Sequence, residues 1–319
     1  MNKSIAIIGG TGFIGMNLAN YFFAKGYSVR VTGRNSIVEG KLVSSKITVI
    51  YFDILDSQKL LDSVEGCEYI VWLVSNLIPN SSLDTLVDDF NYNIKPLITL
   101  LENSNKLDSL KKFVFMSSGG TIYGNSLDNT SFNESSKLSP ISSYGFSKLL
   151  SENYIEFLSR NYRFKTIILR PSNVYGLHQN LNKPQGIIGF AFDSIIKNKE
   201  IILYNEGRVT RDFIHVDDLA KALFRCLETE TIFSQVSIYN VGSNLGLTIA
   251  ELLQLLSEIT KKDLVIKYMP ARPIDCNYNV LDISKIQKDL NWFPEISLKE
   301  GLESMWSWIH RKNGEIIRK

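Results

Sequence analysis

Tyr144 and Lys148 have residue types and a spacing that suit proton transfer. Side chains four residues apart lie on one face of a helix, so the Lys148 ammonium would stand beside the Tyr144 phenol. A phenol has an ordinary pKa of about 10 and is a poor base at neutral pH. Neighbouring positive charge would lower that pKa and turn the pair into a proton shuttle. Taken alone, such a pair is more often a solvated lysine beside a half-buried tyrosine, so its surroundings must decide.

A glycine-rich turn near the N-terminus supplies those surroundings. Gly9, Gly12 and Gly15 follow the apolar run 5–8 and open a helix-like segment. A strand, a glycine-rich turn and a helix N-terminus present backbone N–H groups and a positive helix end to a diphosphate. Gly9 would permit the tight turn, Gly12 the approach of the pyrophosphate, and Gly15 close packing of the helix. The pattern predicts a dinucleotide site, with the tyrosine–lysine pair beside its nicotinamide ring.

The elements that must position these residues alternate along the first half of the chain. Strand-like runs lie at 4–8, 28–32, 47–52, 69–74, 112–117 and 165–170, with helical patterns at 13–25, 57–64, about 84–103 and 143–160. This alternation predicts an α/β fold with a doubly wound parallel sheet, the Rossmann arrangement. Beyond Pro171 the pattern becomes irregular. We therefore expect a dinucleotide-binding domain over 1–171 and a smaller α/β substrate-binding lobe, mainly 172–319, with some segments returning to the main domain.

Composition argues against several other classes of protein. The 319 residues have a formal net charge of +2, which gives no electrostatic footprint for nucleic acid. No apolar run approaches the roughly 20 residues that span a bilayer, and the first strand leaves no room for a signal peptide. Three widely spaced cysteines suit free thiols in a reducing cytoplasm. Three scattered histidines suggest no metal site.

Several further motifs occur in one order along the whole chain. Together with the two patterns above, the sequence resembles the extended short-chain dehydrogenases/reductases, specifically the NAD-dependent epimerase/dehydratase family and its nucleotide-sugar 4-epimerases. The motifs that sharpen the resemblance are Asp53-Ile54, Ser117–Gly124, Leu169–Gly176, Arg211–Asp218, Asp282–Lys285 and Leu290–Pro294.

The resemblance implies a role for each matching residue. Tyr144 would be the base, with Lys148 on the nicotinamide ribose. The other implied cofactor contacts are Gly9, Gly12, Phe13, Ile14, Gly15, Asp53, Ile54, Leu73, Val74, Asn93 and Pro171. Asn173, Arg211 and Arg272 would hold the diphosphate of a nucleotide-sugar substrate, since a guanidinium grips phosphate oxygens bidentately. A turn or cap role for Asn173, and a surface ion pair with Asp212 for Arg211, are the structural alternatives.

The sequence departs from the family pattern at the hydroxyl partner of the base. The family places Ser or Thr four residues before the tyrosine that here is Tyr123, whereas this chain has Gly119. Ser118 or Thr121 would substitute, and Thr121 is the favoured choice. We expect Gly119→Ser to be tolerated if the backbone there does not have positive φ. The absence of a carboxylate after this position argues against a 4,6-dehydratase.

The second departure concerns the choice between NAD and NADP. Members that bind NAD place an acidic residue at the end of the second strand, where it accepts hydrogen bonds from the adenosine ribose. This chain has Gly33 there, followed by Arg34, which would pair with a 2′-phosphate. The cofactor is therefore expected to be NAD or NADP, with a lean to NADP, unless Arg34 simply faces solvent.

The function that these features favour is a cytoplasmic nucleotide-sugar 4-epimerase. It would act on a UDP-linked hexose or N-acetylhexosamine through a 4-keto intermediate, as a homodimer by family resemblance, and bacterial surface-polysaccharide synthesis is a natural setting. An NADP-dependent 4-keto-sugar reductase has the same catalytic pair and is the alternative enzyme. A catalytically silent NAD(P)-sensing or scaffold protein is the alternative from another class.

Overall fold

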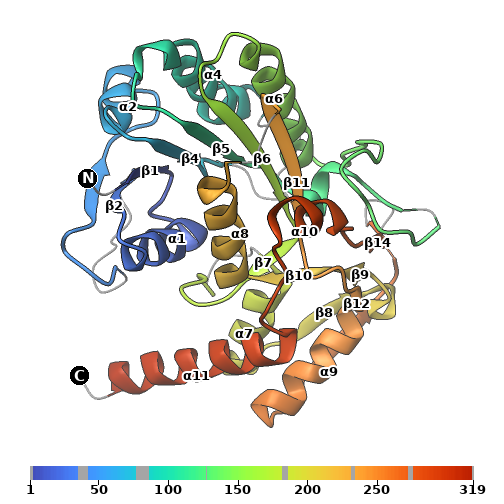
Figure 1. Ribbon diagram of the computed structural model, residues 1–319. Coiled ribbons are helices and arrows are strands. Elements are labelled where there is room, and N and C mark those ends of the chain that lie inside the picture. The colour runs from blue at the N-terminus through green and yellow to red at the C-terminus, as the bar shows by residue number, and fades with distance from the viewer. Residues whose placement is uncertain are drawn as a thin grey trace.

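The computed structural model describes residues 3–34, 42–76, 86–126, 128–181, 186–230, 234–271 and 276–317, with side chains as far as residue 311. Its centre is a seven-stranded parallel sheet in the order β11-β6-β5-β4-β1-β2-β3 (Figure 1). The strands are β1 (Ser4–Ile8), β2 (Ser28–Gly33), β3 (Thr48–Tyr51), β4 (Tyr69–Trp72), β5 (Lys112–Met116), β6 (Lys165–Pro171) and β11 (Val236–Val241). The doubly wound α/β fold predicted from the sequence is confirmed.

Helices cover both faces of this sheet because its strands are apolar on both sides. Ile5 and Ile7 face α1 (Phe13–Ala24), α8 (Val216–Glu228) and α10 (Ser284–Leu290). Ala6 and Ile8 face α2 (Ser57–Val64), α4 (Lys95–Glu102) and α6 (Ser143–Ser159). Alternate residues of a strand point to opposite faces, so one apolar run serves two cores.

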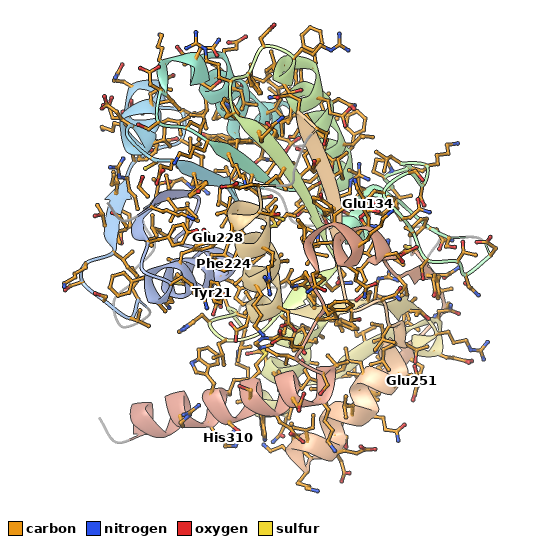
Figure 2. All side chains as sticks on the ribbon, viewed as in Figure 1. Tyr21, Glu134, Phe224, Glu228, Glu251 and His310 are labelled. Atoms are coloured by element: carbon orange, nitrogen blue, oxygen red, sulfur yellow. The ribbon has the colours of Figure 1, made fainter. Side chains whose placement is uncertain are left out.

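Helix α8 belongs to the second half of the chain but packs against α1 of the first. Figure 2 shows Tyr21 of α1 beside Phe224 of α8, and their ring centroids are 6.0 Å apart in an edge-to-face arrangement. At the end of α8, the Glu228 carboxylate accepts a hydrogen bond from Lys3 Nζ at 2.7 Å. Strand β11 likewise comes from the second half and extends the sheet beside β6.

The predicted helix over 84–103 is described from residue 86 and is not uniform. It comprises α3 (Leu86–Asp89), a π-helical turn η2 (Phe90–Ile94) and α4. Pro96 lacks a backbone N–H and lies in the first turn of α4, so it cannot continue the hydrogen bonds of a preceding α-helix. Single π turns of this kind are frequent at functional sites.

The remaining elements build the smaller lobe and the connections to it. Its core includes Phe192, Leu256 and Met305. The elements are β7 (Asn173–Tyr175), α7 (Ile187–Lys197), β8 (Ile201–Tyr204), β9 (Thr210–Arg211), β10 (Phe213–His215), β12 (Leu247–Thr248), α9 (Ile249–Thr260), β13 (Ile266–Met269), β14 (Tyr278–Asn279) and α11 (Leu298–Ile317). Short helices η3 (Ser104–Lys106), α5 (Gly119–Ile122) and η4 (Asn205–Gly207) complete the structure.

Candidate active site

The tyrosine and lysine lie on α6, at the carboxyl edge of β5. Ser142 caps the helix by accepting a hydrogen bond from the Gly145 N–H at 3.1 Å. Lys148 Nζ donates to the Met116 carbonyl at the end of β5 at 3.0 Å, and it lies 5.7 Å from the centroid of the Tyr144 ring. Lys148 is only 6% exposed. The helix thus brings the predicted pair together and fixes the ammonium against the sheet.

Burial dominates the proton affinities of the pair. It raises the pKa of Tyr144 to about 12, although a hydrogen bond with the Ser118 side chain acts in the opposite direction. It lowers the pKa of Lys148 to about 8, while Asp89 and Glu152 act to raise it. The sequence predicts a lowered pKa for Tyr144, whereas the direction in the protein alone is the reverse, because desolvation of the phenolate outweighs the hydrogen bond with Ser118.

The Tyr144 hydroxyl has Ser118 as its hydrogen-bond partner. Ser118 stands in extended backbone directly before α5. The Thr121 hydroxyl lies one helical turn further on, is buried, and has no hydrogen-bond partner within the described part of the chain. The geometry therefore favours Ser118 over Thr121, contrary to our preference from the sequence.

Gly119 is closely packed, which bears on the expected tolerance of serine at this position. Its φ is not positive, but a Cβ there would lie 2.6 Å from Leu281 Cδ1 and 2.9 Å from the Arg170 carbonyl oxygen. Real Cβ atoms do not approach backbone oxygen that closely. The expectation that Gly119→Ser is tolerated is therefore wrong, for a steric reason rather than a conformational one.

The glycine-rich turn is shaped to receive a diphosphate. Gly9 has φ of +77°. A Cβ on Gly15 would lie 2.3 Å from Gly10 Cα, so the helix packs on the turn itself, whereas a Cβ on Gly12 would meet only the Gly9 carbonyl, at 3.7 Å. Gly12 caps α1 and has no side chain that could occupy the first N–H groups of the helix, at Phe13 and beyond. Those donors and the open space beside Gly12 fit a dinucleotide.

The carboxyl ends of the neighbouring strands gather around this turn. A Cβ on Gly9 would lie 3.1 Å from Val74 N and 3.2 Å from the Leu73 carbonyl carbon, which places the ends of β1 and β4 together. From β1 the chain adds β2 and β3 on one side of the sheet and then β4, β5 and β6 on the other, so the strand order switches between β1 and β4. Ligands of open α/β sheets bind at such a switch point.

The end of β2 is packed against the glycine-rich turn. A Cβ on Gly33 would lie 2.1 Å from Thr11 Oγ1. Arg34 is exposed, and its Nη2 donates to Asn76 Oδ1 at 3.0 Å. The Asn76 N–H in turn donates to Asn93 Oδ1 at 2.7 Å, which connects Arg34 to the π turn. The Arg34 side chain thus has a partner within the protein, and the lean to NADP gains no support from it.

The other predicted cofactor residues lie along the same edge. Asp53 follows β3, is exposed, and accepts a hydrogen bond from the Leu55 N–H at 3.0 Å, while Ile54 is half-buried. The Phe52 N–H donates to the Gly33 carbonyl at 3.1 Å, which joins the ends of β3 and β2. Pro171 ends β6, next in the sheet to β5, and is buried. Ile14, half-buried in the first turn of α1, packs against the core.

Two predicted substrate residues meet at Asp212. Asn173 Nδ2 donates to the Asp212 carbonyl at 2.8 Å, and Arg211, the last residue of β9, directly precedes Asp212. The Arg211 guanidinium donates to the Thr210 carbonyl at 2.9 Å. The Asp212 carboxylate is fully buried and accepts hydrogen bonds from both the N–H and the hydroxyl of Ser243. The third predicted residue, Arg272, lies outside the described residues.

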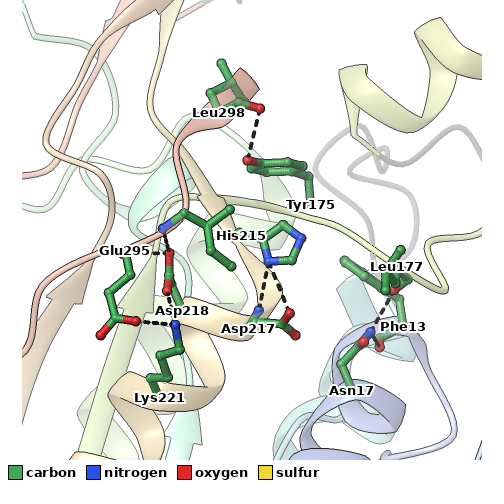
Figure 3. A network of polar contacts seen from close by, with 11 residues as sticks. Phe13, Asn17, Tyr175, Leu177, His215, Asp217, Asp218, Lys221, Glu295 and Leu298 are labelled. Atoms are coloured by element: carbon green, nitrogen blue, oxygen red, sulfur yellow. Dashed lines mark hydrogen bonds and ion pairs between the residues drawn. The ribbon is translucent and has the colours of Figure 1, made fainter. Parts of the chain in front are cut away.

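Contacts from the second half of the chain reach the cofactor helix α1. Figure 3 shows Asn17 Nδ2 donating to both the Phe13 and Leu177 carbonyls, at 2.9 and 2.8 Å. Nearby, His215 Nδ1 accepts from the Asp217 N–H at 3.3 Å and caps α8. These bonds tie the segment after β7 to the helix that begins the dinucleotide site.

A buried ionic network behind α6 was not predicted from the sequence. Arg170 and Glu152 are each 2% exposed and are joined by three hydrogen bonds of 2.6–3.2 Å. Arg170 Nη1 also donates to the Tyr123 hydroxyl at 2.9 Å, and that hydroxyl donates to Asn240 Oδ1 at 2.7 Å. Glu152 follows Lys148 by one helical turn, and this i, i+4 spacing could have placed it near Lys148 but not beside Arg170.

Two kinds of site are not found in the described part of the structure. Within those residues, no helix is sufficiently long and apolar to cross a bilayer. The same residues contain no cluster of three or more His, Cys, Asp or Glu side chains that could hold a metal ion.

The fold and site define a Rossmann-type protein with a tyrosine–lysine pair beside a dinucleotide turn, and comparison with known proteins assigns its family. The model of the "NAD dependent epimerase/dehydratase family" matches residues 5–242. The chain belongs to that family, as its motifs indicated.

Individual relatives are similar over nearly the whole chain. A candidate UDP-glucose 4-epimerase of Methanocaldococcus jannaschii is 31% identical, over 97% of this chain and 99% of its own length. The dTDP-4-dehydro-6-deoxyglucose reductase of Escherichia coli is 27% identical, over 97% and 98% of the two chains. The crystal structure of Thermotoga maritima UDP-glucose 4-epimerase with UDP-glucose has a TM-score of 0.89 and 30% identity, covering 97% and 99%.

Proposed function

We propose that the protein is a UDP-hexose 4-epimerase that works through transient oxidation of its substrate. The observation that supports this most directly is the Tyr144 hydroxyl, hydrogen-bonded to Ser118 and standing beside the buried Lys148 at the edge that holds the glycine-rich turn. Similarity to UDP-glucose 4-epimerases over the full chain supports the same reaction.

Each residue of the pair would have a distinct role. Tyr144 would accept the proton of the sugar C4 hydroxyl as hydride leaves C4, and Ser118 would hold the same oxygen by a hydrogen bond. Lys148 would stabilise the phenolate, which burial otherwise disfavours. The resulting 4-keto sugar would turn about its diphosphate, and Tyr144 would return the proton once hydride has come back on the other face. A positioned general base contributes roughly 10²–10⁴ in rate.

We propose NAD rather than NADP as the cofactor. The family is described as NAD dependent, and Arg34 already donates to Asn76. The donors at the start of α1 would hold the diphosphate, and Lys148 the nicotinamide ribose. NAD would supply a hydride acceptor that returns the hydride within the same turnover. Mass spectrometry of cofactor released from the purified protein separates the two nucleotides, and bound NADP would contradict this choice.

The proposed activity is tested by interconversion of UDP-glucose and UDP-galactose without added reductant. Tyr144→Phe should lower turnover by about 10²-fold or more while NAD is retained, because only one hydroxyl is lost. Tyr154→Phe, on the same helix, is the matched control and should retain activity. Absence of interconversion, together with stoichiometric NADPH oxidation when a nucleotide-linked 4-keto sugar is supplied, would instead identify a 4-keto-sugar reductase, as the name of the Escherichia coli relative describes. Repeating the assay with UDP-N-acetylglucosamine defines the N-acetyl preference.

We also propose that the protein acts as a homodimer in the cytoplasm. Apolar side chains of α3, η2 and α6 are exposed, namely Leu86, Val87, Phe90, Phe146 and Phe157, with Val87 at 75% and Phe157 at 66%. Phe146 and Phe157 share one face of α6, since eleven residues are close to three helical turns. Burying this surface against a second copy would remove it from water. Phe157→Glu should then convert a dimer to a monomer in sedimentation analysis.

Three buried free thiols suit a reducing compartment, which supports the cytoplasm as the location of the protein.

A further inference from the structure

Asp89 is a buried carboxylate that the proposed reaction does not use. It is 4% exposed and ends α3, immediately before the π turn. Its Oδ1 accepts hydrogen bonds from Asn93 Nδ2 at 2.5 Å and from Ser147 Oγ at 2.9 Å. Ser147 is the residue before Lys148 on α6. A side chain at the end of α3 thus holds α6 at the residue next to Lys148.

The charges around Lys148 differ in how they are balanced. Two residues of α6 face Lys148, namely Tyr144 and Glu152. Asp89 faces it from α3. Strand β5 contributes the Met116 carbonyl and the Phe115 ring, neither of which is charged. Arg170 neutralises Glu152 through their three hydrogen bonds. Among the described residues, no ion pair involves Asp89. Asp89 therefore supplies the buried negative charge that is not already paired with an arginine.

We propose that Asp89 is a positioning residue for the proton-transfer pair: it fixes α6 through Ser147 and supplies the charge that keeps Lys148 protonated inside the protein. The inference rests on the proposed function of Tyr144 and Lys148. A buried ammonium is costly unless an opposite charge compensates it. The π turn contributes by bringing Asn93 onto the same carboxylate, where its hydrogen bond helps to fix the Asp89 side chain.

Asp89→Asn keeps the shape of the side chain and removes its charge. Because Asp89 favours the protonated form of Lys148, its neutralisation should move the high-pH limb of the turnover profile about 0.5–1 unit toward lower pH. At pH on that limb, this is a loss of about three- to tenfold relative to wild type. Asp88→Asn makes the same chemical change at the adjacent exposed position and should leave the profile in place. Ser147→Ala should lower turnover without moving the limb, because the charge remains.

Two measurements independent of turnover complete the test. The pH dependence of the NAD dissociation constant should shift in Asp89→Asn as the turnover profile does. In the protein without cofactor, urea midpoints of Asp89→Asn, Lys148→Met and the double variant form a cycle. The loss caused by Asp89→Asn should be smaller in the Lys148→Met background, because the charge that needed compensation is gone.

The outcomes separate this inference from the proposed function. A wild-type protein with neither NAD binding nor epimerisation contradicts the proposed function, while the urea cycle still tests the charge coupling. Coincident pH profiles of turnover for Asp89→Asn and Asp88→Asn overturn the role of Asp89. An equal loss of stability on Asp89→Asn in the wild-type and Lys148→Met backgrounds also overturns it. If Asp89→Asn does not fold, folding of the double variant supports the coupling. Failure of both to fold overturns it, because the carboxylate is then required whether or not Lys148 is charged.

Discussion

Gly33→Asp tests why this chain lacks the acidic residue that contacts the adenosine ribose in many NAD-binding proteins. A Cβ at Gly33 would lie 2.1 Å from Thr11 Oγ1, 2.5 Å from its Cγ2 and 2.8 Å from its Cβ. Rotation about χ1 moves Oγ1 and Cγ2 but leaves the Thr11 Cβ in place. The backbone of β2 or of the glycine-rich turn must therefore shift to admit any side chain at position 33.

The size of the effect follows from this overlap. Forcing extra atoms into a packed site costs about 1–3 kcal/mol. For a protein of 319 residues each kcal/mol corresponds to about 1.5 °C, so Gly33→Asp should lower Tm by about 1.5–5 °C. The displaced turn should also bind NAD more weakly. Gly33→Ala is the matched control, because it adds the same Cβ without the carboxylate and should lower Tm similarly.

Thermal unfolding and NAD titration of a double variant complete the test. Thr11→Gly removes the three atoms that a Cβ at Gly33 would meet. Against the Thr11→Gly background, Gly33→Asp should cost much less stability, and the new carboxylate should favour NAD over NADP. The steric reasoning is refuted if Gly33→Ala leaves Tm within about one degree of wild type, or if the loss is equal in both backgrounds.

Three further changes test the neighbourhood of the base and its lysine. Ser118→Ala should lower turnover by about 10²-fold, more than Thr121→Val does, because Ser118 bonds to Tyr144; steady-state rates showing the reverse order would restore Thr121. Gly119→Ser should lower Tm instead of improving activity, since its Cβ would lie 2.9 Å from the Arg170 carbonyl oxygen; an unchanged Tm would contradict this. Lys148→Met should stabilise the protein without cofactor by up to about 3 kcal/mol at pH 7 and by less at pH 10, as urea unfolding would measure. The sign follows because the folded pKa of about 8 lies below the ordinary 10.5, so the cost of burying the ammonium is complete below pH 8 and disappears as pH rises to 10.5; equal stabilisation at both pH values would refute it.

The strands of the central sheet could be predicted because their physical signal is local. β4 is apolar at every position and β1 at every position after Ser4, as expected of strands buried on both faces. The same edge of such a sheet collects the turns that follow its strands, so the approximate neighbourhood of the cofactor could also be predicted. The π turn could not, because it depends on Pro96 and on the bond from Asn93 to Asp89.

Contacts between distant segments explain what the sequence did not reveal about the site. Arg170 was visible only as part of a motif, and nothing in the sequence indicated that its partner would be Glu152 on the helix before it. Likewise, a Cβ at Gly33 would clash with Thr11, which lies 22 positions earlier in the chain. The residue type at one position says little about such contacts, because arginine, glutamate, glycine and threonine all occur commonly on protein surfaces without such partners.

The hydroxyl partner of the base shows how position along the chain and position in space differ. Gly119 occupies the place where the family has its hydroxyl, yet the Gly119 carbonyl accepts a hydrogen bond from buried Asn279, and its Cβ direction points at Leu281. A hydroxyl added there would face the core beside Leu281, not the tyrosine. Ser118, one residue earlier and in extended backbone, is the residue whose hydroxyl reaches Tyr144. The reaction needs an oxygen within hydrogen-bond distance of the base, and a shift of one residue at the junction of β5 and α5 can supply it without the family's residue at the family's position.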